Sequence, residues 1–102
     1  MTTMQPHDVQ HDPQARRFVL LAQGQRSELD YDLASSPAGD TVMRVLHTGV
    51  PPALQGQGLA AALASAALAE ARARGWRVRP LCSYVRSFMQ RHADTQDLLE
   101  DR

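Results

Sequence analysis

Residues 47–75 read HTGVPPALQGQGLAAALASAALAEARARG. They predict the end of a strand, a loop with two glycines and a long helix. The extended run stops at Pro51 and Pro52, and the alanine-rich part is typical of a helix. The first N–H groups of a helix have no partner within it and lie at the positive end of its dipole. Gly56 and Gly58 have no side chains that would keep an anion away, so this stretch predicts a phosphate-binding site.

Three phosphate-binding designs use such a helix start, and two of them fit poorly. A P-loop requires Gly-Lys-Ser or Gly-Lys-Thr, and the chain contains no lysine. The segment GQGLAA matches the degenerate glycine fingerprint of dinucleotide-binding folds. That fingerprint, however, follows the first strand and is completed by an acidic residue about twenty positions on. Arg77 and Arg79 stand in that region instead, so nicotinamide or flavin binding is disfavoured.

The hydrophobic pattern predicts one small mixed α+β domain. The expected elements are strands at 17–23, 27–34 and 41–47, a helix from Leu54 or Gln55 to Arg74, a strand at 76–82 and a short helix at 83–90 capped by Ser83. In this β-β-β-α-β-α order, the third and fourth strands form a right-handed crossover through the long helix. We therefore expect a mostly antiparallel sheet with one parallel pair. The final ten residues predict a polar helical turn or a frayed end.

Composition limits the function classes. The 102 residues suit a single domain, which we place at 16–102 after a loosely ordered tail at 1–15. The chain shows no long apolar run and no signal peptide, which predicts a cytoplasmic protein without a membrane partner. One cysteine and four scattered histidines predict no metal site. Formal net charge is zero, although six of the eleven arginines fall between Arg72 and Arg91. A solvated helix face explains that bias at least as well as a polyanion site does.

Read from Gln55, the segment QGQGLA resembles the Q/R-x-x-G-x-G/A signature of the GNAT superfamily, the acetyl-CoA-dependent N-acyltransferases. Val50 and Pro52 stand where that family has its approach to the signature. The resemblance covers roughly residues 17–99 and is closest to a group of very small GNAT-like proteins. The further matching residues are His47, Thr48, Pro51, Pro80, Cys82, Ser83, Tyr84, Val85, Phe88, His92, Asp97, Leu98 and Leu99.

The resemblance implies acetyl-CoA as cosubstrate, an amine as acceptor and a parallel strand pair that splays apart to admit the pantetheine arm. The backbone of Thr48, Gly49 and Val50 would pair with pantetheine. The loop and helix start would hold the pyrophosphate through Gln55, Gly56, Gln57, Gly58, Leu59 and Ala60. The amine would attack the thioester directly, with a backbone amide stabilising the oxyanion.

The catalytic candidates are His47, Tyr84 and Cys82. The small GNAT-like group commonly has glutamate where this chain has Gly49, so a carboxylate base is missing there. His47 lies two residues earlier on the same strand face and has a suitable intrinsic pKa, although a hydrogen-bonded strand-end histidine is an equally good interpretation. Tyr84 is the candidate proton donor to the thiolate, against a buried tyrosine with a satisfied hydroxyl. Cys82 is more often a small buried hydrophobe than a nucleophile. We expect His92 to cap or pack the C-terminal turn.

Two functions remain open from the sequence. One is an N-acetyltransferase acting on a small-molecule or protein amine, and the other is a non-catalytic GNAT-like module that binds acyl-CoA as a sensor or interaction domain. Gly49 and the minimal size favour the second. A nucleic-acid-binding module ranks third, because only one face is basic, so no nucleic-acid partner is predicted. The sequence does not indicate the oligomeric state.

Overall fold

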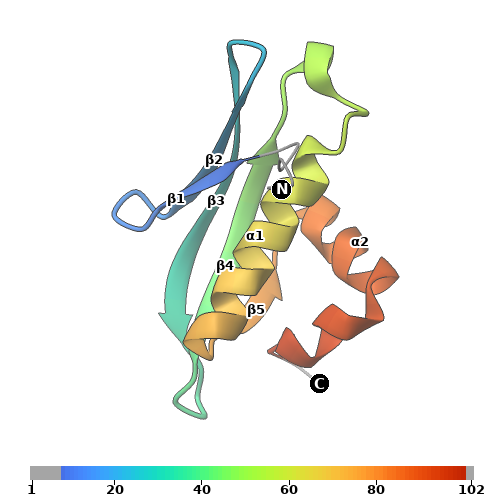
Figure 1. Cartoon of the computed structure of the whole chain (residues 1–102). Coiled ribbons are helices and arrows are strands. Elements are labelled where there is room, and N and C mark those ends of the chain that lie inside the picture. Colours follow the sequence, from blue (N-terminus) through green and yellow to red (C-terminus); the bar gives the residue numbers. More distant parts are fainter. Residues whose placement is uncertain (1–7, 101–102) are drawn as a thin grey trace, which may run out of the picture.

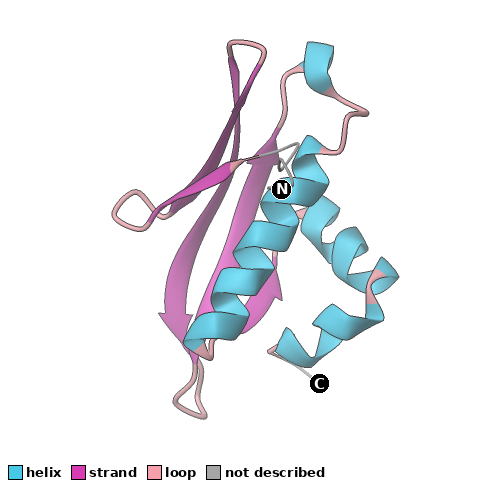
Figure 2. Cartoon of the chain, viewed as in Figure 1, coloured by secondary structure: helices cyan, strands magenta, loops and turns pink. Residues whose placement is uncertain are grey.

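The computed structural model describes residues 8–100, which form one five-stranded sheet with helices on one face (Figures 1 and 2). The strands are β1 (Val9–Asp12), β2 (Arg17–Ala22), β3 (Gln25–Ser35), β4 (Thr41–Gly49) and β5 (Arg77–Pro80). They lie side by side in chain order. The first three pairings are antiparallel, and β4 pairs with β5 in parallel. The predicted α+β class and the single parallel pair are confirmed.

Within residues 8–100, the chain also forms two α-helices and two short 3-10 helices. These are η1 (Pro52–Leu54), α1 (Leu59–Arg74), α2 (Ser83–Arg91) and η2 (Ala93–Leu98). Helix α1 connects β4 to β5 and packs across β2, β3, β4 and β5, while α2 packs beside it. No helix in the described part of the chain is long and apolar enough to cross a membrane.

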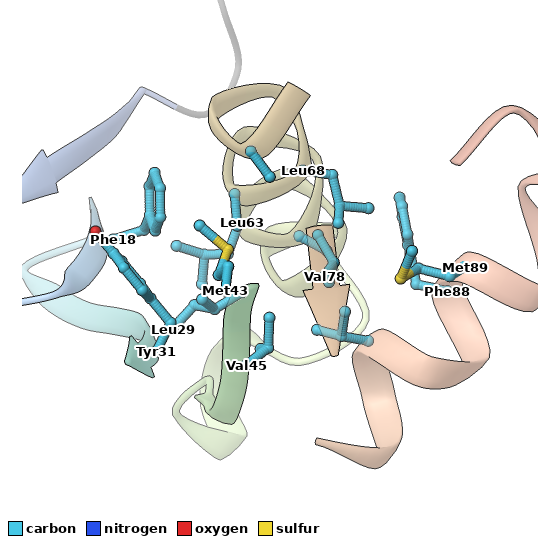
Figure 3. Packing of buried hydrophobic residues seen from close by; sticks show 14 of the residues in the cluster. Phe18, Leu29, Tyr31, Met43, Val45, Leu63, Leu68, Val78, Phe88 and Met89 are labelled. Atoms are coloured by element: carbon cyan, nitrogen blue, oxygen red, sulfur yellow. The ribbon is translucent and has the colours of Figure 1, made fainter. Parts of the chain in front are cut away.

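The core lies between the inner face of the sheet and the two α-helices (Figure 3). Alternation along β3 puts Leu29 and Tyr31 inward, as predicted from its period of two. Alanines at 64, 67 and 71 are fully or almost fully buried, so α1 lies close on the sheet. The other large buried side chains are Phe18, Leu20, Met43, Val45, Leu63, Leu68, Val78, Val85, Phe88 and Met89.

The outer face of the sheet carries charged side chains held in ion pairs. Arg17 Nε lies 2.6 Å from Asp30 Oδ1, and Arg44 Nε lies 2.6 Å from Asp32 Oδ1. Because helices cover the inner face, this outer face is left to solvent, which explains the acidic half of the β3 alternation.

The expected loose tail at 1–15 is corrected in part, because β1 falls within it. Its short, polar sequence VQHD gives little strand signal. The strand is stabilised by contacts that only the fold reveals: the His11 ring stacks on Phe18 at 4.2 Å, and His11 Nε2 lies 2.7 Å from the Tyr31 hydroxyl. Residues 1–7 lie outside the described part of the chain.

Several element boundaries differ from the prediction. Helix α1 begins at Leu59 rather than at residue 54 or 55, because Gly56 and Gly58 adopt φ of +84° and +83°, which interrupts the helix. Strand β5 ends at Pro80, and Cys82 rather than Ser83 occupies the N-cap of α2. The C-terminal part forms η2, and Leu99 then bridges to Val78 on the free side of β5.

Candidate functional site

The glycine loop lies at the end of the molecule where β4 and the β2–β3 hairpin both finish (Figure 1). Residues 55–58 are exposed. The Gln55 side-chain amide donates to the Val50 carbonyl at 3.2 Å, and the Gln23 amide donates to Gln57 Oε1 at 3.4 Å. These two hydrogen bonds connect the loop to Val50, just after β4, and to the β2–β3 hairpin. Gly56 therefore lies between two residues, Gln55 and Gln57, that are held in place by side-chain hydrogen bonds.

The start of α1 presents free amides to this loop. The first bond of the helix runs from the Ala62 N–H to the Gly58 carbonyl at 3.0 Å, so the N–H groups of residues 59–61 have no acceptor within the helix. Gly58 provides no side-chain cap, and no acidic residue lies in the first turn. The buried Leu59 fixes the helix start against the core. The positive end of the dipole is therefore uncompensated and faces an exposed loop.

Strands β4 and β5 part before β4 ends. Their pairing covers Val42 to Val45 on β4, and the Leu81 and Cys82 N–H groups both donate to the Val45 carbonyl at 3.0 Å. Within residues 8–100, no strand pairs with residues 46–49 on the β5 side. This unpaired edge of β4 leads directly toward the glycine loop.

Cys82 contacts β4 at Thr48, beyond the last residue of β4 that pairs with β5. Its thiol donates to Thr48 Oγ1 at 3.5 Å. Burial raises the pKa of Cys82, but hydrogen bonds from Thr48 and from the first-turn amides of α2 outweigh it and leave the pKa below its usual value. Thr48 is paired with the buried Leu29, which places it on the inner face of the sheet. Tyr84 is half-buried nearby in α2, tilted against Phe88 with ring centroids 6.3 Å apart.

A glycine loop before a helix with free amides, beside an unpaired parallel strand edge, is the arrangement that the sequence resemblance implied. The family described as GCN5-related N-acetyl-transferase matches residues 17–98. The chain belongs to this family. A comparison with curated proteins gave no significant match.

In this member of the family, a β-bulge controls which side chains face outward near the end of β4. Tyr31 pairs with Val45 and Asp30 with His47, so Leu46 is the extra residue. Past the bulge, His47 and Gly49 share the outer face, because their partners Asp30 and Glu28 lie on the polar side of β3. His47 is exposed, and its Nε2 lies 3.0 Å from the point where a Cβ on Gly49 would stand. The imidazole thus occupies the space that a side chain at 49 would enter.

The structure brings the predicted site residues together in two groups. Thr48, Cys82 and Tyr84 lie toward the helices, whereas His47 and Gly49 lie on the outer face of β4. The loop residues adjoin both groups through Val50, whose carbonyl binds Gln55. His92 packs as predicted: it caps α2, stacks on Phe88 at 4.0 Å and has Nδ1 2.7 Å from the Phe88 carbonyl.

Sequence reasoning missed the contribution of β3. A shallow hollow of about 330 Å³ on the outer face is lined by Arg26, Glu28, Gly49, Val50 and Pro51. The alternation of residues 27–34 indicated that Glu28 faces solvent. Its position opposite Gly49, however, depends on the bulge at Leu46. The sequence contains no clear signal for that bulge.

Proposed function

We propose that the protein is an acetyl-CoA-dependent N-acetyltransferase that transfers the acetyl group directly to an amine. Family membership supports acyl transfer in general. The observation that carries the finer proposal is the exposed loop at 55–58 in front of the free N–H groups of α1. Backbone amides at a helix start suit the CoA pyrophosphate, because they supply both hydrogen-bond donors and a positive dipole end.

The unpaired edge of β4 suits the pantetheine arm, whose amides can pair with the backbone of residues 48–50 as a further strand would. Gln55, Gly56, Gln57, Gly58, Leu59 and Ala60 then hold the pyrophosphate. This division places the thioester near Thr48 and Cys82, where β4 and β5 part. A backbone N–H along the same edge would stabilise the oxyanion.

The chemical step needs one proton acceptor and one donor. The amine nitrogen forms a bond to the thioester carbonyl carbon, and its proton passes to the His47 imidazole. As the tetrahedral adduct collapses, the carbon–sulfur bond breaks and the CoA thiolate takes a proton from the Tyr84 phenol. His47 then releases its proton to solvent, and Tyr84 regains one from solvent. Cys82 forms no covalent bond in this scheme and contributes through its contact with Thr48.

Amine-dependent release of CoA thiol tests the proposal. We expect the protein with acetyl-CoA to release thiol faster when a panel of small amines or lysine peptides is added than with buffer alone. Mass spectrometry should show the acetylated amine in equal amount. CoA binding without any amine-dependent release across the panel would contradict catalysis and favour the non-catalytic acyl-CoA-binding module, to which Gly49 in place of the family's common glutamate points.

A further inference from the structure

Resting on the proposed function, we propose that Glu28 of β3 is the carboxylate that binds the acceptor ammonium, in the hollow over Gly49. The hollow has a volume of about 330 Å³ and is lined by Arg26, Glu28, Gly49, Val50 and Pro51. Its only carboxylate among these is Glu28. The lining thus holds one carboxylate beside one guanidinium, and the acceptor proposed for it is a primary alkylammonium bound by Glu28.

The register of β3 and β4 places Glu28 opposite Gly49, the β4 position that carries no carboxylate. Glu28 and Gly49 are directly paired. Side chains in such a pair lie on the same face with Cβ atoms about 5 Å apart, so a carboxylate at either position reaches the same space. His47 borders that space, with Nε2 3.0 Å from the Cβ position of residue 49. An ammonium held by Glu28 thus lies beside the His47 imidazole. It loses one proton to solvent to become the free amine, and the second proton passes to His47 as the amine attacks.

Glu28 differs from the other outward carboxylates of β3 in how it is held. Asp30 and Asp32 each accept a 2.6 Å hydrogen bond from an arginine Nε. Glu28 makes looser ion pairs, 3.3 Å from Arg26 Nε and 3.7 Å from Arg17 Nε, both through Oε1. Its side chain accepts no hydrogen bond within residues 8–100, which leaves it able to accept one from a ligand.

Gly49 contributes no side chain between this hollow and the edge of β4 that faces β5. Residues 46–49 have no β5 partner in the described part of the chain, so the acyl group lies along the far edge of the same strand. A strand is about 4.8 Å wide. An amine bound in the hollow beside His47 therefore lies about one strand width from that edge.

Titration of isotope-labelled, CoA-saturated protein with n-butylammonium chloride, followed by NMR, tests the assignment, with 1-butanol as the neutral isostere. We expect amide shifts at residues 26–28, 49 and 50 with n-butylammonium only. Glu28→Gln should weaken this binding about fivefold, as expected for the loss of a partly exposed charge pair. Asp32→Asn, on the same strand and face, should leave it unchanged.

Failure of this inference is separable from failure of the proposed function, because CoA is titrated into the same samples first. Absence of CoA binding would overturn the proposed function. With CoA bound, three results would each overturn the role of Glu28: no shift at the hollow, equal shifts with 1-butanol, or undiminished n-butylammonium binding by Glu28→Gln. Binding that Asp32→Asn weakens as much as Glu28→Gln does would likewise assign Glu28 a structural role.

Discussion

At the scale of single residues, the proposed proton acceptor and the cysteine lie on opposite faces of the sheet. His47 is exposed on the outer face of β4, while Cys82 lies toward the helices and bonds to Thr48. The lowered pKa of Cys82 favours a thiolate, which is a condition for a covalent acetyl intermediate. Direct attack by the amine needs no such intermediate, so the two schemes assign different importance to this cysteine.

Substitution at these two positions distinguishes the schemes. We expect Cys82→Ala to retain most acetyl transfer, whereas His47→Ala slows the chemical step by about 10²–10⁴-fold, as for a lost general base. Tyr84→Phe should slow it in a similar range. Rapid-quench measurement of the first turnover isolates that step. An acetyl adduct on Cys82, formed from acetyl-CoA alone and discharged by amine, would instead make the cysteine the nucleophile.

Ser27 is a second residue whose environment predicts an effect. It is fully buried on the inner side of β3, and its hydroxyl has no hydrogen-bond partner among the described residues. A buried hydroxyl without a partner costs stability. Ser27→Ala should raise the free energy of unfolding by about 1 kcal/mol, measured by urea denaturation. Ser35→Ala, at the exposed end of the same strand, is the control and should have little effect; a destabilised Ser27→Ala would show that the hydroxyl is satisfied.

At the scale of elements, the C-terminal η2 completes the core. Leu98 is buried, and Arg72 of α1 binds Asp97 through two hydrogen bonds of 2.9 Å. Both groups of that ion pair are more than half exposed, so the apolar contact contributes more than the charges. Leu98 lines a cavity together with Leu68 of α1 and Phe88 of α2, so it lies between the two α-helices.

Truncation of Leu98 tests how much its apolar contact stabilises the fold. Leu98→Ala should lower the free energy of unfolding by about 2–4 kcal/mol, since it leaves a cavity between packed helices. Leu21→Ala, at a position that is 72% exposed on β2, should change it by less than about 0.5 kcal/mol. Chemical denaturation of both variants gives the comparison. Equal effects would mean that η2 is not part of the cooperative core.

Elements with strong local signals could be predicted from the sequence. The period of β3, the end of α1 at Arg74 and the glycine loop each follow from residues that are neighbours in the chain. β1 could not be predicted, because its stability comes from His11 stacking on Phe18, a contact between strands. The bulge at Leu46 was equally hidden, and it determines that Glu28 faces Gly49. The candidate site was therefore predicted on β4 and the loop, but not on β3.

At the scale of the whole molecule, the arginine-rich second half is largely neutralised within the fold. Arg72 binds Asp97, Arg74 binds Glu70 at 2.7 Å, and Arg79 binds Glu100 at 2.7 Å. Arg77 donates to the Asp97 carbonyl at 2.7 Å. These pairs support the interpretation of the basic bias as a structural feature, and the expected lack of nucleic-acid affinity stays a prediction.

The Arg79–Glu100 pair also predicts how stability depends on pH. The hydrogen bond from Arg79 holds the pKa of Glu100 below its usual value. A depressed carboxyl pKa stabilises the fold above the unfolded pKa, near 4.3, and this contribution is lost as pH falls through the folded pKa. In urea denaturation from pH 6 to pH 3, the stability difference between wild type and Glu100→Gln should shrink below about pH 4.3. A difference that stays constant would contradict this linkage.

The central claim is that the free amides behind the glycine loop bind CoA, and calorimetric titration of CoA measures this most directly. Gly58→Leu places a bulky side chain at the helix start, and Gly39→Leu is the control, because Gly39 also has positive φ, +91°, but lies in the distant β3–β4 turn. We expect saturable CoA binding by wild type and Gly39→Leu, and at least a tenfold weaker affinity for Gly58→Leu, about 1.4 kcal/mol. Undiminished CoA binding by a folded Gly58→Leu variant would contradict it.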